Sequence, residues 1–171
     1  MRNESGDVLT YSEIGATAGS LPPGYHCFTL RRRIGSGRAL FEQAGVAILA
    51  FVMQKGTGIF DESSTPTAEV GTVLTVRLGV GRLAITAPCK VVYLLEEADR
   101  RGFAYGTLTG HPEIGEELFA VEYDATDDAV YGLITAFSRP GAWYTRIGGP
   151  VVRLIQRYMA GRYIAALPTS A

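Results

Sequence analysis

Gly102–Tyr123 reads GFAYGTLTGHPEIGEELFAVEY, and this stretch decides the fold. It predicts two strands joined by a loop around His111-Pro112, because apolar residues alternate with small or polar ones on both sides of a turn-forming segment. The stretch also places one of the two histidines of the chain close in sequence to Glu113, Glu116 and Glu117. We therefore expect polar ligand contacts or proton transfer to involve this segment first.

Short segments with the same two-residue period surround this stretch. Only a few residues separate them, and such connections join antiparallel neighbours, because a parallel crossover needs about a dozen residues or more. Pro88 interrupts the longest run and predicts a bend, and bends curl a sheet. Asp61–Glu69 is rich in turn formers and is expected to be a loop. The expected strands are Tyr25–Ile34, Thr72–Leu78, Leu83–Ala87, Cys89–Leu95, Gly102–Leu108, Glu116–Tyr123 and Val130–Arg139.

Two segments repeat apolar residues at helical spacing. The first is Arg38–Met53, which Ser36 is expected to cap through its hydroxyl. The second is Trp143–Leu167, with a break expected at Gly148-Gly149-Pro150. The first helix is expected to bury Phe41, Ile48 and Phe51. The second is expected to have one apolar side, formed by Ile147, Val151, Leu154, Ile155, Tyr158 and Met159.

This order of elements predicts an α+β fold. A curved antiparallel sheet of about six or seven strands leaves one face that must be covered, and the C-terminal helix is the only late element long enough to cover it. The predicted architecture is the helix grip, in which the sheet wraps a long C-terminal helix. We expect one domain over residues 1–171, with an irregular lead-in at 1–24 and the helix-grip domain at 25–167. Both a cavity and a filled core are compatible with this arrangement.

Composition narrows the classes of function. The chain has 171 residues and a formal charge of −1, which provides no overall field to attract nucleic acid. Cys27 and Cys89 are too few for a disulfide framework and are expected to be reduced core residues. No segment has the length of an apolar membrane span, and the N-terminus lacks the apolar run of a secretory signal. These features predict a soluble, cytoplasmic protein.

Four blocks of sequence carry a resemblance to a known family. The chain resembles, from about Leu9 to Leu167, the bacterial and plant family catalogued as domain of unknown function nineteen-ninety. That family has no established activity, so the resemblance implies no catalytic residue. The family is similar in turn to START-like helix-grip proteins, and this implies binding of an apolar or amphipathic small molecule. The blocks are Arg31–Gly37, Ala87–Tyr93, Gly102–Phe119 and Ile134–Pro140, followed by Trp143 and Gly149-Pro150.

The expected strand register selects the residues that face the inside of the sheet. A loop from Thr109 to Gly115 pairs Thr107 with Glu117, and a hairpin at Thr126–Asp128 adds the odd-numbered residues of the last strand to the same face. A slip by one residue would reverse these faces. The predicted ligand-binding residues, most of them on this inner side, are Tyr105, Thr107, His111, Glu117, Phe119, Thr135, Phe137, Arg139 and Trp143.

Glu117 and His111 are the candidate catalytic residues. A buried Glu117 without a cation would have a raised pKa and could act as a general acid or base, whereas an ion pair with Arg139 or Arg33 would give it a structural role. His111 lies in a loop, where both functional and surface histidines occur. A zinc site is not expected, because the spacing of His111 and the nearby glutamates differs from the helical HExxH pattern.

The sequence favours a protein that binds an apolar or amphipathic small molecule between sheet and helix. The main alternative is an enzyme of the cyclase, dehydratase or hydrolase type that uses Glu117 or His111 for proton transfer. A third is a peripheral membrane or protein-interaction module that acts through the arginines of the last helix, although such arginines more often form a solvated helix side. No metal, no cofactor and no nucleic-acid partner is expected, and the sequence leaves the oligomeric state open.

Overall fold

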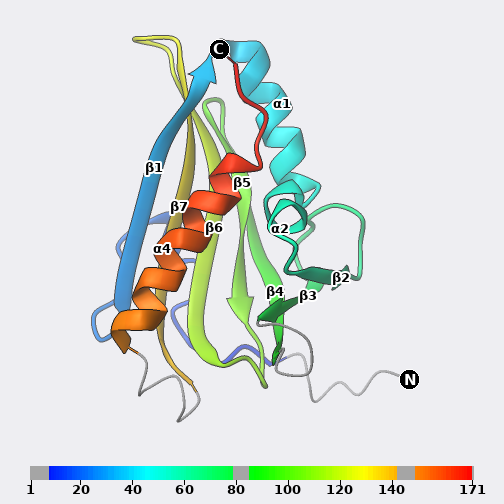
Figure 1. Cartoon of the computed structure of the whole chain (residues 1–171), viewed down its shortest axis with the longest axis vertical. Helices are drawn as coiled ribbons and strands as arrows, with labels where there is room; N and C mark the ends of the chain where they lie inside the picture. The colour runs from blue at the N-terminus through cyan, green and yellow to red at the C-terminus, as the bar shows by residue number, and fades with distance from the viewer. Residues whose placement is uncertain (1–7, 79–84, 142–148, 171) are drawn as a thin grey trace.

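The computed structural model describes residues 8–78, 85–141 and 149–170. One antiparallel sheet of seven strands dominates it, in the order β1-β7-β6-β5-β4-β3-β2 (Figure 1). Only the pairing of β1 with β7 joins strands that are distant in sequence, and the other neighbours follow one another along the chain. The strands are β1 (His26–Ser36), β2 (Phe60–Ser63), β3 (Val73–Leu78), β4 (Ile85–Glu96), β5 (Arg100–Thr107), β6 (Glu113–Asp124) and β7 (Ala129–Pro140).

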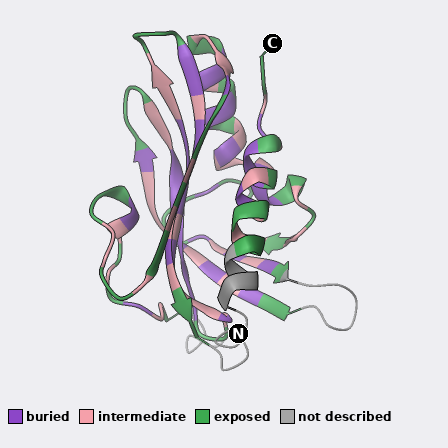
Figure 2. Cartoon of the chain, turned by 60° about the vertical axis from the view of Figure 1, so that its left-hand side comes forward, coloured by how far each residue is buried: buried purple, intermediate pink, exposed green. Residues whose placement is uncertain are grey.

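Helices α1 (Arg38–Leu49), α2 (Val52–Gly56) and α4 (Gly149–Ala165) lie on one side of this sheet (Figure 2). We call that side the inner face. Helix α4 runs along the inner face of β1 and β7, and α1 packs on β5 and β6. The opposite, outer face is covered in part by the N-terminal segment, including the short 3-10 helix η2 (Ala16–Ala18). The α+β helix-grip architecture predicted from the sequence is therefore confirmed.

The core lies between the inner face and the helices. Three rings from different elements, those of Phe51, Phe103 and Phe119, are fully buried, with centroid distances of 5.3 Å between Phe51 and Phe103 and 5.5 Å between Phe103 and Phe119. Burying a side chain of this size stabilises the fold by about 1.5–3 kcal/mol. The predicted burial of Phe41, Ile48 and Phe51 is confirmed. A smaller apolar cluster around Leu118 lies on the outer face.

The register of β5 and β6 differs from the prediction by two residues. Tyr105 lies opposite Glu117, rather than opposite Phe119. Because side chains alternate with a period of two, an even shift leaves every residue on its predicted face. Tyr105 and Glu117 therefore lie on the inner face, as predicted.

The register of β6 and β7 differs by one residue, and this error reversed the faces of β7. Glu117 lies opposite Ala136, so the even-numbered residues of β7 face inward. Thr135 and Phe137 therefore have their side chains on the outer face, which corrects their predicted position. The cause is the connecting loop, which holds the four residues 125–128 where three were expected, with Asp128 at a positive φ of 54°.

Several local predictions were also wrong. Ser36 ends β1 and does not cap α1, since Gly37 with φ 93° occupies the cap position and no side chain bonds there. The first helical segment is divided at Phe51, whose φ of 59° separates α1 from α2. Pro88 lies within an uninterrupted β4, whose irregularity in pairing with β5 falls between Val91 and Tyr93. The predicted polar loop begins with strand β2.

The two cysteines occupy different environments. Cys89 is fully buried on β4, as predicted, whereas Cys27 is exposed on the edge strand β1. Both thiols are free. The difference follows from strand position, because an edge strand has a neighbour on one side only.

The predicted apolar side of helix α4 faces the sheet only in part. Ile155 and Met159 line the cavity, whereas Leu154 and Tyr158 are exposed. The buried residues of α4 include Ala160, Tyr163 and Ile164, which the prediction left out. Trp143 and the predicted helix break up to residue 148 lie outside the described residues. Among the described helices, none is long and apolar enough to cross a membrane.

Candidate functional site

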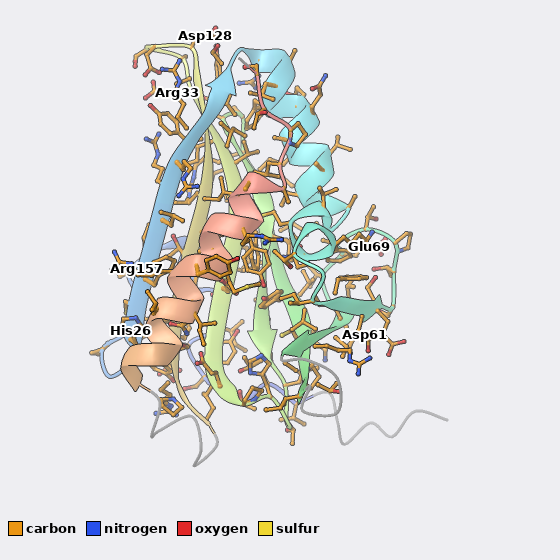
Figure 3. All side chains as sticks on the ribbon, viewed as in Figure 1. His26, Arg33, Asp61, Glu69, Asp128 and Arg157 are labelled. Carbon is orange, nitrogen blue, oxygen red and sulfur yellow. The ribbon has the colours of Figure 1, made fainter. Side chains whose placement is uncertain are left out.

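A cavity of about 490 Å³ lies between the inner face of the sheet and α4. Its walls come from β1, β3, β4, β5, β6, β7, α4 and the loop between β5 and β6. Figure 3 labels His26, at the start of β1, near the N-terminal end of α4, and β1 and α4 are in contact. The apolar walls include Phe28, Ile59, Val76, Ile85, Ala136 and Met159. The polar side chains on the walls include Tyr105, Thr107, His111, Glu113, Glu117, Ser138, Gln156 and Tyr163.

Glu117 is the central acidic group of this cavity. The Tyr105 hydroxyl donates a hydrogen bond of 3.0 Å to its Oε2. Burial, the largest cause, raises the pKa of Glu117 to about 7; the bond from Tyr105 opposes this shift, and the charge of Glu113 contributes to it. The carboxyl group is therefore close to half ionised near neutral pH. The structure provides no ion pair for it among the described residues.

The two arginines proposed as partners of Glu117 lie elsewhere. Arg33 is exposed on β1 and donates to the Gly35 carbonyl. Arg139 is exposed near the end of β7, with its guanidinium 4.9 Å from the centre of the Tyr25 ring. The structural alternative of an ion pair between Glu117 and either arginine is therefore wrong. Glu117 remains a partly buried acid whose hydrogen-bonding partner is a neutral phenol.

Glu116, the preceding residue, has a different environment on the outer face. Its carboxylate accepts four hydrogen bonds from the N-terminal segment, and the residue is 3% exposed. The donors are the Tyr11 hydroxyl, the Gly15 and Thr17 backbone N–H groups and the Thr17 hydroxyl, at 2.5–3.0 Å. Glu116 thus fastens the N-terminal segment to the sheet. The two neighbouring glutamates therefore differ in the number of hydrogen bonds that they accept, which is four for Glu116 and one for Glu117 among the described residues.

Tyr163 of α4 joins the group around Glu117. It lines the cavity together with Tyr105, and burial raises the pKa of both phenols well above the ordinary value, with the charge of Glu117 adding to the effect. Burial also raises the pKa of the Cys89 thiol, again with a contribution from Glu117. Both phenols and the thiol are therefore neutral at physiological pH. Glu117 is thus surrounded by neutral groups.

His111 borders the same cavity from the loop between β5 and β6. Its Nδ1 accepts a hydrogen bond of 2.9 Å from the Glu113 backbone N–H. Burial lowers the pKa of His111 to about 4, so the ring is neutral at pH 7. Its Nδ1 also lies 2.9 Å from the Glu113 carbonyl oxygen, so the Glu113 backbone holds the ring through this atom.

Glu113 lies beside His111 and is tied to α4. The Gln156 Nε2 donates 3.0 Å to Glu113 Oε2 and 3.1 Å to the Ser138 hydroxyl. Burial raises the pKa of Glu113, while the bonds from Ser138 and Gln156 lower it. A second acid therefore faces the cavity, on the same strand as Glu117.

Comparison with known sequences identifies the family. The model of the "Domain of unknown function (DUF1990)" matches residues 10–166. The chain belongs to the DUF1990 family. A "UPF0548 protein" of Deinococcus radiodurans is 36% identical over 173 residues, covering 95% of this chain and 87% of that protein. "UPF0548 protein At2g17695" of Arabidopsis thaliana is 31% identical over 133 residues, covering 74% and 64% of the two chains.

Solved structures similar to this DUF1990 domain share its fold at low sequence identity. A hypothetical protein of Helicobacter pylori superposes with a TM-score of 0.60 at 9% identity, over 94% of this chain and 96% of that one. A norcoclaurine synthase point mutant of Thalictrum flavum gives 0.54 at 13%, over 84% and 96%. The major latex-like protein 151 of Panax ginseng gives 0.53 at 16%, over 83% and 96%. These neighbours place the DUF1990 domain among the Bet v1/START-like helix-grip folds.

The DUF1990 domain brings four of the predicted site residues together at the cavity. Tyr105, Thr107, His111 and Glu117 all line it. Thr107 is engaged locally, since its hydroxyl accepts 3.0 Å from the Gly115 N–H. Their convergence follows from β5, β6 and the loop between them, the elements of the deciding stretch.

The other predicted residues have different places. Phe119 is on the inner face but is a fully buried core residue. Thr135 pairs across the outer face with Thr29, and the Phe137 ring packs against Tyr11 and Tyr25 there, although Phe137 borders the cavity. Arg139 is exposed and Trp143 lies outside the described residues.

Five of the polar side chains on the cavity wall were missed in the ligand-binding prediction, namely His26, Glu113, Ser138, Gln156 and Tyr163. Glu113 is part of the stretch Gly102–Tyr123, and its neighbour His111 was already predicted to bind the ligand. His26 follows the Pro-rich turn that begins β1. Gln156 and Tyr163 come from α4, three residues before and four residues after Met159, so helical spacing from Met159 could have found them.

The arrangement allows proton transfer without a metal. Within the described residues, no three His, Cys, Asp or Glu side chains form a group that could hold a metal ion. A carboxyl group with a pKa near 7, next to a phenol and inside an apolar cavity, can donate or accept a proton at neutral pH. The same group can equally orient a bound molecule by a hydrogen bond.

Proposed function

We propose that this DUF1990 domain binds an apolar or amphipathic small molecule in the cavity between its sheet and α4. The observation that carries the proposal is the cavity itself, with a volume of about 490 Å³ and mostly apolar walls. Small-molecule sites have volumes of about 300–1,000 Å³, with apolar walls that provide affinity and a few polar groups that fix orientation. Glu117, Tyr105, His111 and Gln156 supply such groups here.

The helix-grip fold supports the proposal without deciding it, because a fold hosts many functions. One neighbour is a norcoclaurine synthase described in complex with a transition-state analogue, which is a property of that protein. For the DUF1990 domain the argument rests on its own cavity.

A second candidate function is catalysis in the same cavity. The raised pKa of Glu117 favours it, because a general acid or base works best when its pKa lies near the operating pH. A substrate bound against Tyr105 and Glu117 would undergo proton transfer, as in a cyclisation, dehydration or hydrolysis. Turnover that Glu117→Gln abolishes while ligand binding persists would support this function.

The test of binding uses two neighbouring positions of β7 that face opposite ways. Ala136 lines the cavity and Thr135 is on the outer face. We expect the neutral fluorescent probe N-phenyl-1-naphthylamine to bind the wild-type protein with enhanced emission. Ala136→Phe places a ring in the cavity and should weaken binding by at least about tenfold, which corresponds to about 1.4 kcal/mol.

Thr135→Phe is the matched control, since it adds the same ring on the other side of the same strand. It should leave the affinity within about twofold of wild type, a difference of about 0.4 kcal/mol. Equal loss in both variants, or no enhancement with the wild type, would contradict the proposed function. Circular dichroism of each variant establishes that the sheet is retained.

A further inference from the structure

The charged side chains that face the cavity have one sign. Two carboxyl groups, those of Glu113 and Glu117, are part of its wall. Arginine and lysine are absent from the lining within the described part of the chain. Because the cavity is largely apolar, a charge inside it interacts more strongly than it would in water. The negative charge of the cavity wall therefore favours some ligands over others according to their own charge.

Four of the other titratable groups around Glu117 are uncharged and do not offset this sign. Cys89 of β4, Tyr105 of β5 and Tyr163 of α4 are neutral, because burial raises the pKa of each. His111 is neutral at pH 7, because burial lowers its pKa to about 4. His26 of β1 is the remaining titratable side chain on the wall and lies close enough to Glu113 to lower the pKa of that acid.

Glu117 also has unused capacity to accept hydrogen bonds. A carboxylate can accept about four. Glu116 next to it accepts four from the protein, whereas Glu117 accepts one, from Tyr105, among the described residues. A buried carboxylate that lacks donors is costly, and a ligand that supplies donors and positive charge relieves that cost.

We propose that the ligand of this cavity is a lipophilic amine, with an apolar body against the walls and a protonated amino group at Glu117, while Glu113 adds to the negative charge of the wall. This inference rests on the proposed function and adds the chemical class of the ligand. An ammonium group donates up to three hydrogen bonds and brings the charge that the wall lacks. A fatty acid with the same hydrocarbon chain as the amine brings a further negative charge and, when ionised, no hydrogen-bond donor. The cavity therefore disfavours the fatty acid.

The ion pair between the amine and Glu117 makes the affinity for the amine depend on pH. A cationic amine binds the ionised form of Glu117, so its affinity rises with pH until the pKa of the carboxyl group is passed. Well below that pKa the gain is about tenfold per pH unit. Binding of an alcohol of the same length depends on the same carboxyl group only through a neutral hydrogen bond and changes less.

The test compares three ligands with one chain and different head groups. Decylamine, decanol and decanoate displace N-phenyl-1-naphthylamine from the wild-type protein at pH 6 and pH 8. We expect decylamine to compete at least about tenfold better than decanoate at pH 8, and its advantage to shrink at pH 6, a change of about 1.4 kcal/mol or more.

Two variants locate the preference. Glu117→Gln keeps the shape and removes the charge, and it should reduce the preference for amine over decanoate by at least about fivefold, or about 1 kcal/mol. Glu122→Gln is the matched control, because Glu122 is on the same strand but on the outer face, bonded to Arg31 and Arg100. It should leave the preference unchanged.

The outcomes separate this inference from the proposed function. If the probe binds and decanol or decanoate competes as well as decylamine, the cavity binds ligands but the amine assignment is wrong. If Glu122→Gln and Glu117→Gln lower the preference equally, the effect is one of overall charge and the assignment is wrong as well. If neither the probe nor any of the three ligands binds, the proposed function fails, and this inference fails with it.

Discussion

Replacement of Glu117 by glutamine should stabilise the protein at alkaline pH and have little effect at acid pH. Burial raises the pKa of this carboxyl group from its ordinary value of 4.5 to about 7. The folded protein therefore holds a proton that the unfolded chain has released between those two pH values. The site contributes its full stability below pH 4.5, and that contribution is lost as the pH rises through about 7.

The magnitude follows from the size of the shift. One pKa unit corresponds to about 1.4 kcal/mol, so a shift from 4.5 to about 7 corresponds to about 3 kcal/mol at most. Glutamine has the same shape and no charge to bury. The free energy of unfolding of Glu117→Gln should therefore exceed that of the wild type by up to about 3 kcal/mol at pH 8 and match it near pH 4.5. For a chain of this size that difference raises the Tm by roughly 6–12 °C.

The assay is thermal or urea unfolding of both proteins across pH 4.5–8.5, followed by circular dichroism. Glu122→Gln controls for the loss of one negative charge, and its difference from the wild type should not change between pH 5 and pH 8, because Glu122 pairs with Arg31 and Arg100 on the outer face. The reasoning would be refuted if the advantage of Glu117→Gln were the same at pH 5 and pH 8. It would equally be refuted if the variant were less stable than the wild type at pH 8, because that result would mean that the folded protein gains from the charge.

Three further predictions concern the surroundings of the site. Burial lowers the pKa of His111 from 6.5 to about 4, so the free energy of unfolding of the wild type should fall by up to about 3 kcal/mol as the pH drops through that range. His111→Asn should reduce this loss of stability at acid pH, as measured by urea unfolding. The same loss in the variant and the wild type would contradict the prediction. Glu116→Gln leaves buried donors without a charged acceptor and should lower the free energy of unfolding by about 2–3 kcal/mol. It should also speed amide hydrogen exchange at Gly15, which donates to this carboxylate. Unaltered exchange at Gly15 would contradict the role of Glu116 in holding the N-terminal segment. A Cβ at Gly106 would lie 2.1 Å from the Tyr11 hydroxyl, so Gly106→Ala should displace that ring and lower the Tm by several degrees; a rise in Tm would disprove the close fit.

The alternation of apolar residues was sufficient to predict the helix-grip architecture and every strand except β2, although it divided β4 into two. It could place Tyr105 and Glu117 on the inner face despite an error in register, because that error was an even number of residues. It failed at Thr135 and Phe137, because the loop before β7 is one residue longer than the turn signal indicated. Turn length is decided by a few local dihedral angles, such as the positive φ of Asp128, and the sequence pattern does not determine them.

The candidate site was predictable where it is local and not where it is assembled from distant segments. His111 and Glu117 belong to one stretch, and both reach the cavity. Tyr163 was missed because both sides of α4 carry large apolar residues, and only packing selects the buried side. The hydrogen bonds that Glu116 accepts come in part from Thr17, which is 99 residues away in the sequence. The residues next to Glu116 and Glu117 in the sequence therefore could not show which of the two lacks hydrogen-bond donors.

The most direct test of the central claim is a map of where an apolar molecule binds. Titration of N-phenyl-1-naphthylamine into the ¹⁵N-labelled protein, followed by amide chemical shifts, provides this map. The cavity predicts saturable shifts concentrated at Tyr105, Gly115, Ala136 and Met159, which line it from β5, β6, β7 and α4. Shifts confined to the exposed apolar residues Leu154 and Tyr158, or no saturable shifts at all, would contradict the claim that this domain binds ligands between its sheet and its helix.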